Sequence, residues 1–289
     1  MTEGFPLIGE LPHHLVEQAV RNALAEDLGL AGDLTSQASL PRDATAFATL
    51  SAREPGVIAG LRLAAEAFRQ IGHGVSFEPQ VADGASVVAG DVVARVSGNA
   101  RQVMGAERTA LNFLNHLSGI ATLTHAFVEA VAGTGARICD TRKTTPGLRA
   151  FEKHAVRCGG GFNHRFALDD AILIKDNHIV VAGGVAKAYA AARAYAGHLV
   201  AIEIEVDSLA GLEEALGAGA TIVLLDNMDN AMLRQAVALN RGRARLEASG
   251  GVTLERVGGI AATGVDYISS SQITMGAKPL DLGLDVQIA

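Results

Sequence analysis

The chain has 289 residues, enough for one large domain or two smaller ones whose core needs no disulfide or metal support. Hydrophobic residues make up 49% of the chain and charged residues 19%, which excludes the disordered and fibrous classes of protein. The formal net charge of −7 argues against an extended nucleic-acid surface, so any site for an anion must be local.

The cysteines and the apolar segments indicate the cellular compartment of the protein. Cys139 and Cys158 are the only cysteines, too few for a disulfide framework and without the CxxC spacing of a zinc site. The first residues, with Glu3 and Glu10, show neither the basic nor the apolar region of a secretory signal. No run of about 18 apolar residues is free of charge. We therefore expect a cytoplasmic protein with no membrane segment and no nucleic-acid partner.

The first part of the chain predicts helices around a small sheet. Apolar residues recur at helical spacing over 14–27, and Gly29 ends the run. Residues 44–104 contain short alternating apolar stretches broken by glycine and proline, with a helix expected over 62–71. A second long helix is expected to begin near Gly105. This pattern favours a small antiparallel sheet with helices.

After Gly135 the pattern changes to six β-like stretches, most of them separated by Ala-rich helical stretches. The alternation is typical of parallel βα units, and six strands fall two short of a closed eightfold barrel. The stretches cover residues 136–142, 171–177, 199–206, 221–227, 245–249 and 266–270. Residues 275–289 are expected to return to the first domain, which we place at 1–113, with the barrel at 114–274.

Polar side chains end all six predicted strands. Active sites of parallel barrels lie at the carboxyl ends of their strands, and strand alternation places Asp140 with Arg142 and Glu203 with Glu205 on common faces. A solvent-exposed loop explains a polar residue at any single strand end equally well. Polar residues at all six strand ends together favour an active site at this end of the barrel. The residues at these ends are Arg142, Lys143, Lys175, Asp176, Glu205, Asp226, Asn227, Ser249, Gly250, Gly251, Ser269, Ser270 and Ser271.

Residues 142–178 are basic although the chain as a whole is acidic. They hold seven lysines and arginines against four acidic residues, and three of the chain's five lysines, Lys143, Lys153 and Lys175. Local positive charge of this kind suits a pocket for a small anionic molecule, because phosphate and carboxylate sites often use a compact ammonium. For Lys153, a solvated helix face shared with Glu152 is an equally good interpretation.

Two further groups at the strand ends suggest phosphate and metal chemistry. Ser249, Gly250 and Gly251 precede a predicted helix, so their backbone N–H groups could hold a phosphate, although a plain tight turn is the alternative. Glu205 and Asp226 are single carboxylates beside a basic site, which suits Mg²⁺ held through one or two carboxylates and substrate phosphates. They could instead be counter-ions to Lys175 and Arg142.

The motifs resemble those of the quinolinate phosphoribosyltransferases, in order and in spacing. The matching segments span nearly the whole chain. They are EDLGLAGDLTS (26–36), ERTALNFLNHLSGIAT (107–122), TRKTTPGLR (141–149), GGGFNHR (159–165), LIKDNH (173–178), EIEVD (203–207), LLDN (224–227) and EASGG (247–251).

The resemblance implies an α/β fold, with an N-terminal α/β sandwich domain joined to an open, incomplete barrel of six or seven parallel strands, in a homodimer or an assembly of dimers. It also implies a reaction in which quinolinate and phosphoribosyl pyrophosphate give nicotinate mononucleotide, CO₂ and pyrophosphate with Mg²⁺, in NAD biosynthesis. Quinolinate carries two carboxylates, and each terminal phosphate carries roughly −1.5 to −2 charges. The basic segment supplies the cations that such substrates need.

Roles for individual residues follow from the same resemblance. Arg142, His164, Arg165 and Lys175 would bind quinolinate, Lys143 would lie between the two substrates, and Arg108 would reach the partner's site. We expect Glu205 and Asp226 to stabilise positive charge that develops at the anomeric carbon, directly or through Mg²⁺. The remaining substrate-binding residues are expected at the strand ends: Ser249, Gly250, Gly251, Ser269, Ser270 and Ser271.

The sequence supports three other functions less well. A paralogous pyrophosphorylase found with molybdenum-transport genes shares this architecture, but the intact TRKTTPGLR and NHR segments favour the quinolinate enzyme. The stretch ADGASVVAGDVVARVSG resembles a swinging-arm carrier module, yet residues 76–104 contain no lysine that could be modified. A nicotinamide-dependent oxidoreductase is poorly supported, because no GxGxxG motif follows a predicted strand.

Overall fold

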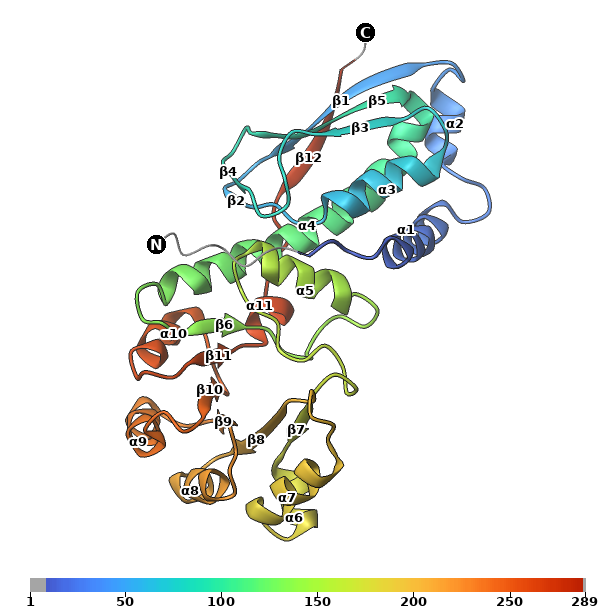
Figure 1. Cartoon of the computed structure of the whole chain (residues 1–289). Helices are drawn as coiled ribbons and strands as arrows, with labels where there is room; N and C mark the ends of the chain where they lie inside the picture. Colours follow the sequence, from blue (N-terminus) through green and yellow to red (C-terminus); the bar gives the residue numbers. More distant parts are fainter. Residues whose placement is uncertain (1–8, 288–289) are drawn as a thin grey trace. The chain divides into compact units, whose positions relative to one another are not determined.

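The computed structural model describes residues 9–287 (Figure 1). The start of the predicted first domain, including Glu3, and the last two residues of the predicted returning segment lie outside them. The described chain divides into two compact units: one comprises the residues up to His125, Ala150–Gly160 and those from Ala277, and the other comprises Ala126–Arg149 and Gly161–Gly276. The division falls within helix α4 (Ala100–Ala130), which also contains the predicted boundary at residue 113.

The first unit is built on a four-stranded antiparallel sheet of order β12-β1-β5-β3, beside a two-stranded sheet of β2 and β4. Strand β12 comes from the end of the chain and pairs with β1, so that Leu50 lies opposite Leu284. Burial alternates along β1, as expected of a strand with one face toward a core. The strands are β1 (Thr45–Ala52), β2 (Gly56–Val57), β3 (Ser76–Pro79), β4 (Ser86–Val87), β5 (Val92–Asn99) and β12 (Leu282–Gln287).

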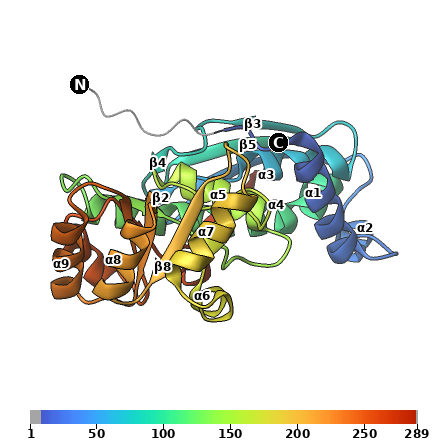
Figure 2. The same ribbon diagram turned by 60° about the horizontal axis from the view of Figure 1, so that its bottom comes forward.

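Helices α3 and α4 lie on one side of this sheet (Figures 1 and 2). The apolar stripe of α3 is fully buried, and the ring of Phe68 stacks on Phe77 of β3 with the ring centroids 5.6 Å apart. Helix α1 contacts α3 and buries Val16, Val20 and Leu24, three residues that share one helix face. Besides α4, the helices of this unit are α1 (His13–Leu28), α2 (Leu34–Ser39), α3 (Leu61–Ile71) and α5 (Arg149–Cys158).

Helix α5 corrects one alternative from the sequence. The solvated helix face that would carry Glu152 and Lys153 is wrong, because the two residues are only 0% and 2% exposed. Glu152 accepts a hydrogen bond from Nε2 of His116 on α4 at 2.9 Å. A buried charge needs such a partner, since an isolated one would be costly in a low dielectric.

The second unit is a six-stranded parallel sheet of order β6-β11-β10-β9-β8-β7, with β6 and β7 at its edges. It therefore confirms the expected open α/β barrel. The six strands fall inside the six predicted stretches. They are β6 (Arg137–Cys139), β7 (Ile172–Ile174), β8 (Ile202–Val206), β9 (Ile222–Asp226), β10 (Arg245–Ser249) and β11 (Tyr267–Ser269).

The helices of the second unit follow the strands in chain order, and successive helices from α6 to α10 contact one another. Their apolar residues, such as Leu212 and Val257, are fully buried, as are the helix-facing residues of the strands, such as Ile204 and Leu225. The helices are α6 (Asp176–Ala182), α7 (Val185–Tyr195), α8 (Leu209–Gly217), α9 (Asn230–Asn240), α10 (Leu254–Ala261) and α11 (Gln272–Met275).

The outer edge of β6 is occupied by a short extended segment. Phe162 bridges to Cys139 in parallel: its N–H donates to the carbonyl of Ile138 at 2.8 Å, and its carbonyl accepts from Asp140 at 3.1 Å. These bonds satisfy edge groups of the sheet and fix the start of the segment that leads to His164.

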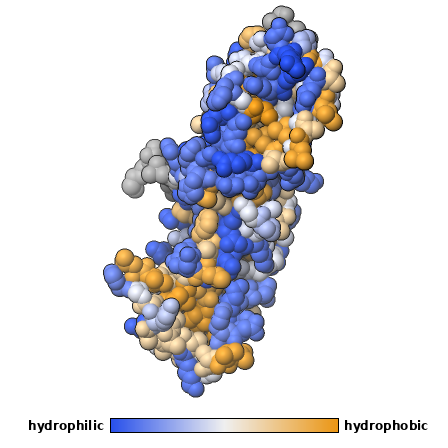
Figure 3. Space-filling model, turned by 90° about the vertical axis from the view of Figure 1, so that its right-hand side faces the viewer, coloured by the Kyte–Doolittle hydropathy of each residue, from blue (hydrophilic) through white to orange (hydrophobic). Residues whose placement is uncertain are grey.

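Several large apolar side chains of the second unit are exposed. Val180, Val181, Tyr195 and Leu199, on and after α6 and α7, are 78% to 88% exposed. Figure 3 shows hydrophobic residues at the lower end of the molecule, the level at which Figure 1 draws α6, α7 and α8. Among the described residues, no helix is both long and apolar enough to span a bilayer.

Candidate active site

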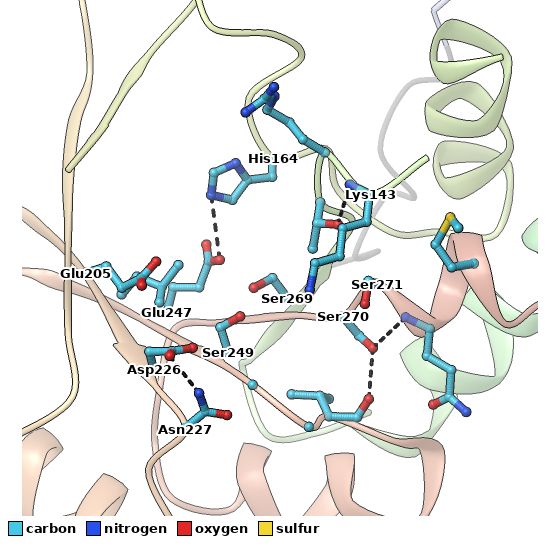
Figure 4. A pocket seen from close by; sticks show the side chains of 18 of the residues that line it. Lys143, His164, Glu205, Asp226, Asn227, Glu247, Ser249, Ser269, Ser270 and Ser271 are labelled. Carbon is cyan, nitrogen blue, oxygen red and sulfur yellow. Dashed lines mark hydrogen bonds and ion pairs between the residues drawn. The ribbon is translucent and has the colours of Figure 1, made fainter. Parts of the chain in front are cut away.

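A cavity of about 940 Å³ opens at the carboxyl ends of the parallel strands of the second unit (Figure 4). Every residue with a predicted catalytic or binding role except Arg108 lines it, and of the strand-end residues named above Asp176 alone does not. Its walls also include residues to which the sequence assigned no role. The full lining is Thr141, Arg142, Lys143, His164, Arg165, Leu173, Lys175, Glu205, Leu224, Asp226, Asn227, Glu247, Ser249, Gly250, Gly251, Val252, Thr253, Ser269, Ser270, Ser271, Gln272, Met275 and Gly276.

The twofold period of the strands explains why these side chains meet. Leu173 and Lys175 both line the cavity, as do Leu224 and Asp226, because residues two apart on a strand share a face. Ile204, which precedes Glu205, is instead fully buried. The parallel register sets Asp226 beside Ser249 of the next strand, so groups from separate strands reach the same edge of the sheet.

His164 is held at fixed orientation by its neighbours. The carboxylate of Asp140, which is fully buried, accepts the backbone N–H of His164 at 2.9 Å. The Nδ1 atom accepts the backbone N–H of Arg165 at 2.7 Å, and Nε2 lies 2.9 Å from Oε2 of Glu203. Since Nδ1 is an acceptor, the imidazole carries its proton on Nε2 and donates it toward Glu203.

Two buried carboxyl groups form an acidic layer under the cavity. Glu203 and Glu247 are 8% and 6% exposed, and Oε1 of Glu247 lies 3.7 Å from Nε2 of His164. Burial, followed by repulsion from Glu203, raises the pKa of Glu247 from 4.5 to about 7. Below about pH 7 this carboxyl group is therefore mostly protonated beside His164.

The raised pKa of Glu247 predicts a pH-dependent gain in stability for Glu247→Gln. The folded state holds this proton more tightly than the unfolded state, so its contribution is complete below about pH 4.5 and is lost as the pH rises through about 7. Glutamine mimics the protonated form at every pH. We expect urea unfolding to give the variant an advantage about 2 kcal/mol larger at about pH 8 than at about pH 5. An advantage that does not change with pH would contradict this interpretation.

Positive charge also gathers in this cavity. Burial, followed by repulsion from Arg142, lowers the pKa of Arg165, so these two guanidinium groups lie close enough to repel each other. Their Nε atoms are both buried and without a hydrogen-bond partner among the described residues. Two neighbouring guanidinium groups with buried donors to spare are suited to bind a carboxylate. Lys175, at the end of β7, adds a third cation.

The loops after β10 and β11 form a hydroxyl-rich and glycine-rich end of the cavity. Ser270 donates its hydroxyl hydrogen bond to the carbonyl of Val252 at 2.9 Å, which joins the two loops. Gly250 has a φ of +94°, and a Cβ there would lie 2.8 Å from the backbone nitrogen of Asn227, so only glycine fits. The short side chains leave backbone groups within reach of a ligand, as phosphate sites require.

Glu205 and Asp226 end the neighbouring strands β8 and β9 on the cavity side. Burial raises the pKa of Glu205, as does repulsion from Asp226, whereas the charge of Lys175 lowers it. The Nδ2 atom of Asn227 donates to Asp226 at 2.7 Å. Two carboxylates that repel each other at a wet cavity mouth are suitable oxygen ligands for Mg²⁺.

Arg108 and Lys153 lie outside the cavity. Arg108 is an exposed residue of α4 in the first unit and does not line this cavity. Lys153, within the basic segment, belongs to α5 of the first unit instead. Sequence reasoning gave Glu203 and Glu247 no role. Strand alternation already set Glu203 on the same face as Glu205, and the same two-residue spacing from Ser249 is the signal that could have found Glu247.

Comparisons with known proteins agree over the whole chain. The family model described as "Quinolinate phosphoribosyl transferase, N-terminal domain" matches residues 33–118, and the model for the C-terminal domain matches 120–285. The chain is 43% identical to the nicotinate-nucleotide pyrophosphorylase [carboxylating] of Mycobacterium leprae, over 97% of this chain and 100% of that one. It is 40% identical to the probable enzyme of that name from Bacillus subtilis, over 96% and 95%.

Solved structures agree as well. The nicotinate-nucleotide pyrophosphorylase from Francisella tularensis superposes with a TM-score of 0.93 at 40% identity, over 98% of this chain and 100% of that one. The counterpart from Pyrococcus furiosus, at 17% identity and a TM-score of 0.70, has the same fold. These matches show that the chain belongs to the quinolinate phosphoribosyltransferase family.

Proposed function

We propose that this protein transfers the phosphoribosyl group of phosphoribosyl pyrophosphate to quinolinate and removes one carboxylate, giving nicotinate mononucleotide, CO₂ and pyrophosphate. This reaction would serve NAD biosynthesis. The observation that carries the proposal is the lining of one cavity, which brings guanidinium groups and carboxylates together with a glycine-rich and hydroxyl-rich segment. The relatives from Mycobacterium leprae and Nicotiana tabacum bear names for this activity.

Recognition of the diacid would fall to Arg142, Arg165 and Lys175, with His164 beside them. Quinolinate brings two negative charges, which offset the repulsion between the two arginines. Each charge-assisted hydrogen bond contributes about 1.5 to 3 kcal/mol, or roughly a tenfold to hundredfold gain in affinity. The fixed imidazole limits the poses open to the pyridine ring.

The phosphates of the second substrate would lie at the other end of the cavity, against Ser249 to Gly251 and Ser269 to Ser271. Lys143 lies on the rim, and its carbonyl accepts a hydrogen bond from Oγ1 of Thr274 at 2.8 Å. That bond fixes the backbone from which the Lys143 side chain projects between the two ends (Figure 4). This placement suits a cation that contacts both substrates.

Positive charge develops at the anomeric carbon during the reaction. The pyridine nitrogen forms a bond to that carbon while the bond to the pyrophosphate oxygen breaks, and the transition state carries positive charge on the sugar. Glu205 and Asp226 are the carboxylates placed to stabilise it. Loss of CO₂ then leaves an electron pair on the ring carbon, which the neighbouring cations stabilise until a proton bonds to that carbon.

Mg²⁺ is part of the proposal. Glu205 and Asp226 would hold it, because both carboxylates line the cavity and Asp226 repels the negative charge of Glu205. When bound, the ion would neutralise charge on the departing pyrophosphate.

We also propose a homodimer in the cytoplasm. Exposed apolar residues on α6 and α7 suit a subunit contact, and Arg108 would reach the partner's cavity. Cys139 and Cys158 are buried thiols rather than disulfides, which fits a reducing compartment.

The test of this function is CO₂ release from carboxyl-labelled quinolinate. We expect CO₂ and pyrophosphate in equal amounts, only when quinolinate, phosphoribosyl pyrophosphate and Mg²⁺ are all present. Chelation of the metal should abolish both products, and added Mg²⁺ should restore them. Consumption of phosphoribosyl pyrophosphate with another acceptor and without CO₂ would instead favour the molybdenum-associated paralogue.

A further inference from the structure

A second cluster of ligand-type side chains lies in the first unit and belongs to none of the chemistry described above. Asp83, His154 and Cys158 each offer one ligand atom, and these three atoms lie within 4.8 Å of one another. The set combines a carboxylate, an imidazole and a thiol. These are the donors that divalent zinc takes in proteins.

The sequence brings two of the three residues together through one helix. His154 and Cys158 are four residues apart on α5, so their side chains lie on the same helix face, one turn apart. Asp83 comes from the loop between β3 and β4, far away in the sequence. A pair of ligands at i and i+4 is a frequent arrangement in metal-binding helices.

Hydrogen bonds already orient the carboxylate for a cation. Oδ1 of Asp83 accepts the backbone N–H of Leu61 at 3.1 Å. Oδ2 is thereby directed to Nε2 of His154 at 2.9 Å. A backbone donor on one carboxylate oxygen fixes the other oxygen as a ligand, which is how outer partners position metal ligands.

The surroundings limit solvent access to the three ligand side chains but leave one route by which an ion can reach them. The side chains of His154 and Asp83 are 9% and 17% exposed, and Cys158 is 6% exposed. Asp83 and His154 line a cavity of about 660 Å³ whose other walls include Phe77 and Val81. An ion entering from this cavity meets the carboxylate and the imidazole first, and Cys158, which is not among the lining residues, completes the set.

The thiol is held neutral in the absence of a cation. Burial, and then the negative charge of Asp83, raises the pKa of Cys158. A divalent ion reverses both effects, because it offsets the carboxylate and binds the thiolate directly.

We propose that Asp83, His154 and Cys158 form a site for Zn²⁺, or a similar divalent transition metal, with a water from the cavity as fourth ligand. The three side chains match the tetrahedral N, S and O donor set of zinc. On binding, the thiol of Cys158 loses its proton to solvent, and no electron is transferred. Mg²⁺ is a poor competitor because it prefers oxygen ligands and octahedral geometry. The site is independent of the transferase reaction proposed above.

Cobalt absorption spectroscopy tests the proposal on the full chain. The reduced protein is first freed of metal with a chelator and then titrated with Co²⁺ in excess Mg²⁺. We expect a sulfur-to-cobalt charge-transfer band that saturates at one Co²⁺ per chain and disappears when Zn²⁺ is added. Co²⁺ bound at the carboxylates of the active site gives no such band, since no cysteine lines that cavity. Absence of the band in the unmodified chain would overturn the site.

The two cysteines provide a matched pair of variants. Cys158→Ser should remove the band, whereas Cys139→Ser, at the other buried thiol, should keep it. His154→Gln and Asp83→Asn keep the thiol and should weaken Co²⁺ binding at least about tenfold, since loss of even an outer partner costs that much. They also serve if Cys158→Ser does not fold. A band that survives Cys158→Ser, or unchanged affinity in both other variants, would refute the assignment.

Discussion

Replacing Arg165 with alanine is expected to weaken quinolinate binding roughly 100-fold or more. Arg165 is half-buried beside Arg142, and its planar guanidinium can form two parallel hydrogen bonds to one carboxylate. Loss of two such bonds, at roughly tenfold or more each, gives this effect. Arg165→Lys keeps the charge but loses the paired geometry, so it should recover only part of the affinity. Isothermal titration with quinolinate measures each value.

Two comparisons separate a binding defect from unfolding. Arg245 lies at the opposite end of β10, is 68% exposed and pairs with Asp266 at 3.2 Å, so Arg245→Ala should bind quinolinate normally. Removal of Arg165 takes away a repulsion with Arg142 but also a hydrogen bond to the carbonyl of Ala171 at 3.1 Å, so urea unfolding of Arg165→Ala is measured beside binding to show that the variant is folded. Normal quinolinate affinity in a folded Arg165→Ala protein would remove this residue from the acid site.

The substitution Glu205→Gln is expected to abolish most turnover and leave quinolinate binding intact. The carboxylate acts on charge that exists only in the transition state, so its loss should lower kcat by roughly 10²- to 10³-fold. Quinolinate is an anion, so removing a negative charge should not weaken its binding. Steady-state kinetics together with quinolinate titration separate the two effects. An unchanged kcat would remove Glu205 from the mechanism.

The pH profile supplies a second measurement for Glu205. Burial and Asp226 raise its pKa above the ordinary value in the metal-free chain, so activity at subsaturating Mg²⁺, where binding of the ion needs the ionised carboxylate, should fall on acidification at a higher pH than for an ordinary glutamate. This limb should be absent from the residual activity of Glu205→Gln. Glu213, exposed on α8, is the matched control, and Glu213→Gln should reproduce the unmodified profile.

Much of the fold followed from local patterns. The six barrel strands were predicted because each is a short apolar run that ends in polar residues, and the helices that separate them are long and periodic. Helix α1 was located within one residue at each end, since Gly29 stops it. The pairing of β12 with β1 joins residues more than 200 positions apart, and no local pattern encodes its register.

The site was less predictable than the strands. Strand alternation was enough to predict that Lys175, Glu205 and Asp226 lie at the same end of the barrel. The contact of His164 with Glu203 was not foreseen, because it depends on how the chain returns along β6 after Gly161. Burial of Lys153 was not foreseen either, since a lysine beside a glutamate on a helix has the pattern of a solvated face.

The free edge of β6 has a consequence for the choice of acceptor. In a closed ring another strand would occupy the place where Phe162 bridges to Cys139. Here that place begins the segment 161–171, which carries His164 and Arg165 but contributes no strand to the sheet. Redesign for a different aromatic acid can therefore begin by exchanging this one segment, with every βα unit of the barrel left intact.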